Sequence, residues 1–205
     1  FRTKKKNYFL GYRRSCSFKN YFNFAYCLFI ANHRSLTETL DYILNLGSLI
    51  GERDKALELV HCYELSIETI KENSKNLSVN PKVYIEEWDE PMISGIQWFS
   101  EIVEICGGKD ICSSKSHGVL AKDRFISKEF VRTKNPDIIL ASWCGKKVDL
   151  ASFEKRLGWS DINAIKTGHV YELEPEIFLQ PGPALFESGL NLLSGIIQNW
   201  SKSTS

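Results

Sequence analysis

Strand-like and helix-like segments alternate along this chain from residue 79 to its end. The strand patterns are residues 82–88 (KVYIEEW), 135–143 (NPDIILASW) and 169–173 (HVYEL). Apolar residues at helical spacing mark residues 94–108, 149–156 and 183–200. Strands that alternate with helices predict βαβ units and a mainly parallel sheet with helices on both faces. We therefore predict an α/β lobe over residues 79–205.

Two helices are predicted ahead of this lobe, within residues 35–78. The sequence SLTE is a capping box, in which Ser35 caps the helix and Glu38 bonds back to Ser35. This helix is expected to end at Gly47. The second helix begins near residues 52–54 and runs to about Leu77. At roughly 25 residues it would span close to 37 Å, which suits either a strut between two lobes or a long surface helix.

The first 34 residues have a different composition from the rest. Residues 1–37 hold eight Lys or Arg residues and no acidic residue, whereas residues 38–205 hold 18 basic and 25 acidic residues, a net charge of −7. An acidic body argues against a broad nucleic-acid surface there. The apolar run Phe22–Ala31 follows a basic start as in a signal peptide, but no small-residue cleavage site follows it. We expect a truncated or altered start rather than a signal peptide.

The sequence offers little for catalysis or for metal binding. The six cysteines show no CxxC spacing, and we expect core thiols rather than a metal site. Cys106 and Cys112 are close enough in sequence for a local disulfide, which the sequence leaves open. Motifs of the types GxSxG, GxGxxG, HExxH and the P-loop are all missing. An enzyme that pairs Cys144 with His117 or His169 stays an alternative, but we expect no catalytic residues and no cofactor.

Three segments follow the predicted strands and would lie at one edge of the sheet, where open α/β sheets bind ligands. They are EWDEP, SWCGK and EPEIFLQPGP. Large flat side chains at such an edge suit a sizeable planar ligand. Alternatively, the two tryptophans are core residues. The candidate ligand-binding residues are Trp88, Asp89, Glu90, Trp143, Phe178 and Gln180.

Several motifs together resemble a family. The sequence VYIEEWDEPMISGIQWFSEIVEICGGKDI is one of them, and ISKEFVRTKNPDIILASW, GWSDINAIKTGHVYEL and LQPGPALFESGLNLL follow it in order. They resemble the periplasmic substrate-binding proteins of ABC importers for cobalamin and iron–siderophores, and the cobalamin-binding branch most. The segment ANHRSLTETLDYILNLGSLIGERDKALELV is similar to the family's approach to its lobe-connecting helix. The resemblance covers residues 30–200.

The resemblance implies a fold and a division of the chain. It implies a Rossmann-like C-terminal lobe over residues 79–205, and residues 35–78 would include the long lobe-connecting helix of a helical-backbone (class III) binding protein. Residues 1–34 would be an unmatched basic segment with a remnant of the N-terminal lobe, which is otherwise missing. The protein would be a monomer, periplasmic or lipid-anchored outside the cytoplasm.

The resemblance also implies roles for single residues. Glu129 falls where cobalamin binders carry an acidic residue that docks on permease arginines, although a solvated glutamate at a helix start is an equal alternative. Ala184 stands where the family often has an arginine, in PGPA instead of PGPR. This favours a corrinoid over an anionic siderophore, while the basic Lys115–Arg124 loop can still meet a phosphate or a propionate.

The leading functional hypothesis is therefore an importer binding protein that captures a cobalamin-like corrinoid and delivers it to the permease subunits. The same fold with iron–siderophore or haem as its cargo is the first alternative. Nucleic-acid binding through the basic N-terminal arm is a remote alternative, and we expect no nucleic-acid partner.

Overall fold

The computed structural model of the protein describes residues 30–204. The described residues belong almost wholly to one compact unit, Ala31–Ser205. Its elements follow in the order α1 (Leu36–Leu49), α2 (Arg53–Ser74), β1 (Lys82–Asp89), β2 (Met92–Ser94), α3 (Gln97–Ile105), β3 (Lys109–Asp110), α4 (Ser113–Ser116), the 3₁₀ turn η1 (Ala121–Arg124), α5 (Lys128–Lys134), β4 (Ile138–Ala141), α6 (Leu150–Glu154), α7 (Asn163–Lys166), β5 (Val170–Glu172), α8 (Pro175–Phe178), the π-helical turn η2 (Leu185–Gly189) and α9 (Leu190–Thr204).

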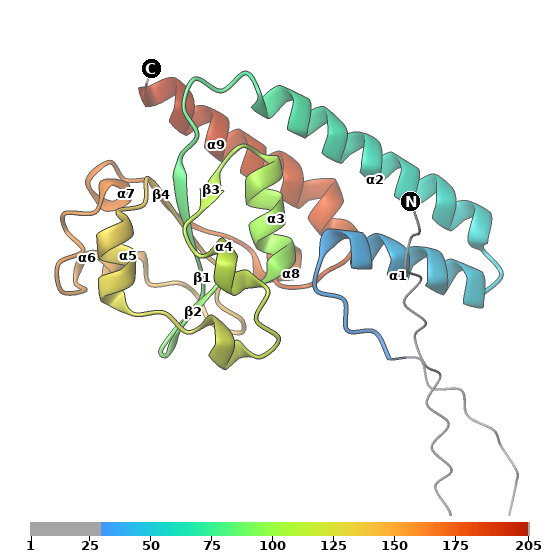
Figure 1. Ribbon diagram of the computed structural model, residues 1–205, viewed down its shortest axis with the longest axis horizontal. Coiled ribbons are helices and arrows are strands. Elements are labelled where there is room, and N and C mark those ends of the chain that lie inside the picture. Colours follow the sequence, from blue (N-terminus) through green and yellow to red (C-terminus); the bar gives the residue numbers. More distant parts are fainter. Residues whose placement is uncertain (1–29, 205) are drawn as a thin grey trace, which may run out of the picture. The chain divides into compact units, whose positions relative to one another are not determined.

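The described strands form one mixed sheet in the order β2-β1-β4-β5, and β3 also pairs with β1. The pairs β1–β4, β4–β5 and β1–β3 are parallel, which confirms the prediction of a mainly parallel sheet. Strand β2 is the exception, because it returns antiparallel to β1 directly after Pro91. The α/β class is confirmed, and the helices lie on both sides of the sheet (Figure 1).

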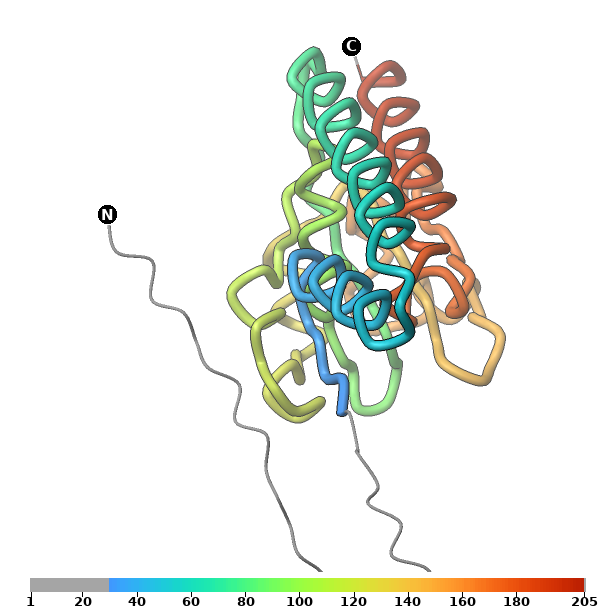
Figure 2. Tube along the Cα trace, turned by 90° about the vertical axis from the view of Figure 1, so that its right-hand side faces the viewer, coloured from blue at the N-terminus to red at the C-terminus, as the bar shows by residue number. Residues whose placement is uncertain are grey.

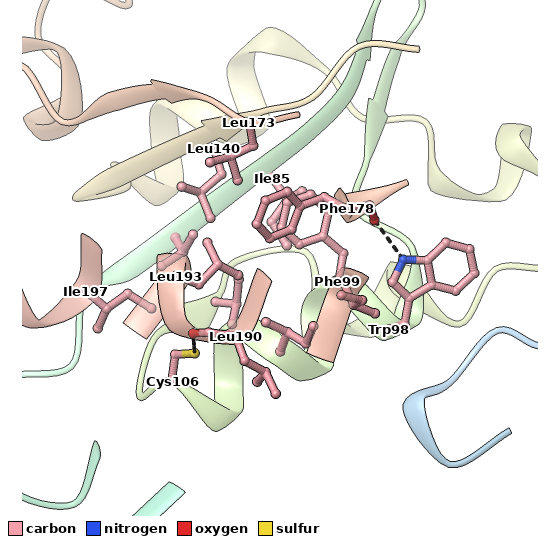
Figure 3. Close-up of a cluster of buried hydrophobic side chains, with 14 of the residues drawn as sticks. Ile85, Trp98, Phe99, Cys106, Leu140, Leu173, Phe178, Leu190, Leu193 and Ile197 are labelled. Atoms are coloured by element: carbon pink, nitrogen blue, oxygen red, sulfur yellow. Dashed lines mark hydrogen bonds between the residues drawn. The ribbon is translucent and has the colours of Figure 1, made fainter. Parts of the chain in front are cut away.

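The two faces of the sheet pack into two hydrophobic clusters. Side chains alternate along a strand, so Val83 and Ile85 of β1 join one cluster while Tyr84 joins the other. The first cluster contains residues from α1, α2, α3 and α9, and Figure 3 shows part of it around Phe99 and Leu193. The second contains residues from α5, α6 and α7. The sheet is therefore the middle layer of three.

Helix α1 begins as predicted but ends later. The Ser35 hydroxyl accepts the Glu38 backbone N–H at 3.1 Å, whereas the Glu38 carboxylate accepts the N–H of Arg34, one residue before the expected partner. The helix passes through Gly47 and ends at Leu49. A Cβ at Gly47 would lie 2.4 Å from the Cβ of Ala56 in α2. Glycine at this position therefore permits the close approach of two helices and does not end α1.

Helix α2 is the long helix that the sequence predicts, with 22 residues, and it ends at Ser74. Helix α9 lies beside it (Figures 1 and 2). The Tyr63 hydroxyl of α2 donates to the Glu187 carboxylate at 2.8 Å, and its ring stacks on Phe186 at 4.8 Å. Among the described residues, no helix is long and apolar enough to cross a membrane.

A buried ion pair joins the centre of the sheet to the segment after α6. Both guanidinium Nη atoms of Arg156 donate to the fully buried Glu86 carboxylate, at 2.6 and 2.8 Å. The Tyr84 hydroxyl donates to the same carboxylate at 2.9 Å. The Arg156 guanidinium also lies 4.2 Å from the ring centroid of Phe153 and 4.6 Å from that of Trp159. The charge on Glu86 is thus matched without water.

We expect Arg156→Met to lower the free energy of unfolding by about 3–5 kcal/mol, because it leaves the Glu86 carboxylate buried without a counter-charge. The double variant Glu86→Leu/Arg156→Met removes both charges and should regain most of that loss. Urea unfolding followed by circular dichroism measures both. A double variant no more stable than Arg156→Met would contradict this account.

A second buried carboxylate belongs to Asp110 of β3. It accepts the Ser100 hydroxyl at 2.7 Å and the Cys112 backbone N–H at 2.8 Å. Burial raises the pKa of Asp110 from 3.8 to about 6, although both hydrogen bonds oppose the rise. The folded chain therefore holds a proton on Asp110 at a pH where the unfolded chain has lost it.

This difference in the pKa of Asp110 between the folded and unfolded chain predicts that the free energy of unfolding depends on pH. The stabilisation from protonated Asp110 is complete below pH 3.8 and is lost as the pH rises to about 6. Asp110→Asn should therefore gain stability relative to the wild type between pH 4 and pH 7, by up to about 3 kcal/mol. Urea unfolding at several pH values measures the difference. A difference that does not change with pH would show that Asp110 ionises normally in the folded chain.

Candidate functional site

The carboxyl ends of three parallel strands meet at one edge of the sheet. Glu86 of β1 is in register with Ala141 of β4, and Ala141 with Glu172 of β5. The segments that follow these residues include Trp88–Glu90, Ser142–Cys144 and the chain after Leu173. They are the three segments predicted from the sequence, and this edge is where open α/β sheets bind ligands.

Lys146 joins three side chains at this edge, and we refer to Trp88, Asp89, Trp143 and Lys146 as the Lys146 cluster. The ammonium nitrogen lies 2.7 and 2.9 Å from the two carboxylate oxygens of Asp89. It also lies 4.4 Å from the ring centroid of Trp88 and 4.6 Å from that of Trp143. Partial burial opposes ionisation of Asp89, but the bond from Lys146 holds its pKa below the usual value.

The two tryptophans of the cluster differ in exposure. Trp88 is half-buried, and its indole N–H donates to the backbone carbonyl of Glu90 at 2.9 Å, while the Glu90 residue itself is exposed. Trp143 is buried and stacks on Phe153 at 6.2 Å. Its indole nitrogen makes no hydrogen bond to any of the residues that the structure describes. Trp88 can therefore meet a ligand directly, whereas Trp143 supports Lys146 from below.

A solvent-open pocket of about 330 Å³ adjoins the cluster. Trp88 and Cys144 line it from the carboxyl edge. The other lining residues are Glu87, Ile93, Ile96, Trp98, Arg124 and Leu179. Most of this wall is apolar or aromatic, with two charged groups. Such a surface suits a ligand with a large apolar body and a few polar groups.

The two charged groups form a buried ion pair. The Arg124 guanidinium donates from Nη1 to the Glu87 carboxylate and to the Ser94 carbonyl. Glu87 also accepts the backbone N–H of Ile96 at 2.6 Å. Burial raises the pKa of Glu87, and the bonds from Arg124 and Ile96 oppose this rise. The pair fixes β1, β2, the start of α3 and η1 around one pocket.

The structure places Phe178 in the core and Gln180 at the surface. The Phe178 ring is fully buried and stacks on Phe99 at 5.1 Å, and the Phe178 carbonyl accepts the Trp98 indole N–H at 2.9 Å (Figure 3). A ligand cannot reach this ring, so we withdraw Phe178 from the candidate site. Gln180 is exposed and does not line the pocket, whereas Leu179 does.

Seven of the pocket residues were not predicted as ligand-binding residues: Glu87, Ile93, Ile96, Trp98, Arg124, Cys144 and Leu179. One available signal was the pair of adjacent acidic residues, Glu86 and Glu87, between the apolar residues of β1. Buried carboxylates need partners, so this pair indicated two basic residues elsewhere. The sequence pattern does not indicate which basic residues these are.

Glu129 lies away from the pocket, at the exposed first turn of α5. Ser127 caps this helix by accepting the Phe130 backbone N–H at 3.1 Å. The Glu129 carboxylate accepts two bonds from Arg132, at 2.7 and 2.9 Å, and these bonds lower its pKa. Glu129 is therefore a charged group that a partner protein can reach.

The described residues hold no group of three or more His, Cys, Asp or Glu side chains that could bind a metal ion. Cys106 and Cys112 are separate buried thiols, and burial raises the pKa of each to about 12. Cys144 is exposed at the pocket, but no histidine lines this pocket, and His169 contacts Tyr171 at 2.9 Å. Among the described residues that line the pocket, none is a histidine that could pair with Cys144.

Two solved structures share this fold. The haem complex of IsdE from S. aureus has a TM-score of 0.67 and 22% identity, and the match covers 80% of this chain and 65% of that one. The vitamin B12 binding protein BtuF of Vibrio cholerae has a TM-score of 0.63 and 17% identity, and that match covers 83% of this chain and 64% of BtuF. At this level of identity the likeness shows the fold alone.

Sequence comparison is more specific. The chain is 29% identical over 174 residues to the uncharacterized ABC transporter substrate-binding lipoprotein YvrC of Bacillus subtilis. That match covers 82% of this chain and 53% of the relative, so the chain spans about half the length of the curated relative. A family model described as periplasmic binding protein matches residues 20–177, which is more than half of the chain. The chain therefore belongs to the periplasmic binding protein family.

Proposed function

We propose that this chain is part of the substrate-binding protein of an ABC importer, and that it captures a cobalamin-like corrinoid and delivers it to the permease. The observation that carries this proposal is the pocket at the carboxyl edge, where Trp88 and Trp98 stand beside apolar side chains. A corrinoid is broad and largely flat, and aromatic walls bury such a body at a low cost in conformational entropy. The relative named as a substrate-binding lipoprotein supports the transport role.

The proposal assigns a role to each part of the chain. Residues 79–205 would form the C-terminal lobe, and α2, within residues 35–78, would be the helix that connects it to a second lobe. Residues 1–34 would carry the remnant of that lobe. The ligand would then lie between the pocket described above and the second lobe. We keep Trp88, Asp89, Glu90, Trp143 and Gln180 as proposed residues of the cleft rim.

A corrinoid is favoured over an anionic siderophore by Ala184, which stands where the resemblance leads us to expect an arginine. Haem or an iron–siderophore is the second candidate, because one structural neighbour is described as a complex with haem. We propose binding without catalysis, since the described residues that line the pocket include no histidine to pair with Cys144. We also propose that the protein works outside the cytoplasm, because the relative from Bacillus subtilis is described as a substrate-binding lipoprotein.

Trp88 provides the direct test of the pocket. Isothermal titration of the full chain with cyanocobalamin should show saturable binding with a dissociation constant below about 100 µM. Trp88→Ala should weaken this binding about tenfold, because it removes the accessible aromatic wall.

Phe130→Ala serves as the control, since Phe130 is a partly buried aromatic on α5 that does not line the pocket. It should leave the affinity unchanged. Saturable binding of haemin or of a ferric siderophore, with none of cyanocobalamin, would select the second candidate.

We propose that Glu129 contacts arginines of the permease, because it is charged and exposed at the start of α5. In the full-length protein, Glu129→Lys should lower corrinoid uptake by cells at least fivefold and leave corrinoid affinity unchanged, since like charges would meet at the interface. Glu58→Lys makes the same charge change on an exposed residue of α2 and should have no effect. Normal uptake with Glu129→Lys would remove this docking contact.

A further inference from the structure

One edge of the Arg124 guanidinium has no partner. Its bonds to the Glu87 carboxylate and to the Ser94 carbonyl both leave from Nη1. The Nε atom is buried and makes no hydrogen bond. Arg124 is only 7% exposed and lines the pocket. Within the described residues, the Nε–Nη2 edge is therefore the side of this cation that remains unused.

An unpaired buried donor is unusual in a folded protein, because the lost hydrogen bonds to water are not replaced. The Nε–Nη2 edge of a guanidinium presents two parallel N–H groups, and their spacing matches two oxygens of a carboxylate or a phosphate. A ligand with such an anionic group would satisfy this edge. An apolar or cationic group at the same place would leave it unpaired.

The charged groups near Arg124 include a second guanidinium, that of Arg34. Burial lowers the pKa of Arg34, and repulsion from Arg124 lowers it further. Arg34 donates to the backbone carbonyls of Gly118 and Val119, which carry no net charge. Glu87 thus faces two cations.

Two further carboxylates attract Arg34 more weakly, those of Glu38 and Asp123. Both are exposed, and each already accepts a backbone N–H, from Arg34 and from Leu120 respectively. Neither lines the pocket. Arg34 does not line the pocket either, so the buried charged groups that a ligand meets inside it are those of the pair Glu87–Arg124.

We propose that Arg124 binds an anionic group of the cargo, either a carboxylate or a phosphodiester, through its Nε–Nη2 edge. This inference rests on the proposed function and adds the chemistry by which the pocket orients its ligand. The apolar wall buries the body of the cargo, and Arg124 determines which side arm enters. A phosphodiester is the anionic group of cobalamin, and carboxylates are the anionic groups of haem.

Two pairs of ligands test the proposal and distinguish a phosphodiester from a carboxylate as the group that Arg124 binds. Cyanocobalamin carries the phosphodiester that dicyanocobinamide lacks, and haemin carries the carboxylates that haemin dimethyl ester masks. Each is titrated into the full chain by calorimetry. We expect the anionic member of one pair to bind at least tenfold more tightly than its neutral partner.

Arg124→Lys is the informative variant. It keeps a cation beside Glu87 and so preserves the fold, but it lacks the two-donor edge, and it should reduce the tenfold preference to about twofold or less. Lys122→Gln removes an exposed charge of the same turn that does not line the pocket, and it should keep the preference. Circular dichroism confirms that each variant is folded.

The outcomes separate the role of Arg124 from the proposed function. Equal binding of both members of each pair, or a preference that survives in Arg124→Lys, overturns the role of Arg124 and leaves the proposed function intact. If none of the four ligands binds, the proposed corrinoid cargo and its haem alternative fail, and the inference fails with them. A preference that Arg124→Lys abolishes and Lys122→Gln keeps supports both the proposed function and the role of Arg124.

Discussion

The geometry of the candidate site depends on the buried ion pair between Glu86 and Arg156. Glu86 lies within β1, two residues before Trp88, and its carboxylate is fully buried. Such a charge is tolerated only when a partner is fixed in place. Arg156 meets this need and is itself held between two aromatic rings, one of which, Phe153, stacks on Trp143. The contacts thus run from the centre of the sheet to the Lys146 cluster.

Two adjacent glutamates of β1 serve opposite faces of the sheet. Because side chains alternate along a strand, Glu86 turns to the cluster with α6, while Glu87 turns to the pocket and pairs with Arg124. Each arginine comes from a different loop segment, and each ion pair holds that segment against β1. Through these two neighbouring carboxylates, β1 holds both the residues beneath the Lys146 cluster and the residues that line the pocket.

This arrangement fits a protein that binds a large ligand on a preformed surface. The rim residues are fixed by bonds to one another, as in Lys146 with Asp89 and Trp88 with the Glu90 carbonyl. A surface that is already ordered loses little conformational entropy on binding. Membership of the periplasmic binding protein family agrees with such a role. The unused edge of Arg124 is the part of the pocket that would select among cargoes by charge.

The sequence by itself determined the α/β lobe, the long helix α2 and the placement of Trp88, Asp89 and Glu90 at the carboxyl edge. These features follow from periodicity and from the ends of strands, which are local properties of the chain. Only the tertiary structure decided that Phe178 is buried while its neighbour Leu179 faces the pocket. It also decided which arginine pairs with each glutamate of β1. Such choices depend on contacts between segments far apart in sequence, and the packing of the whole lobe sets them.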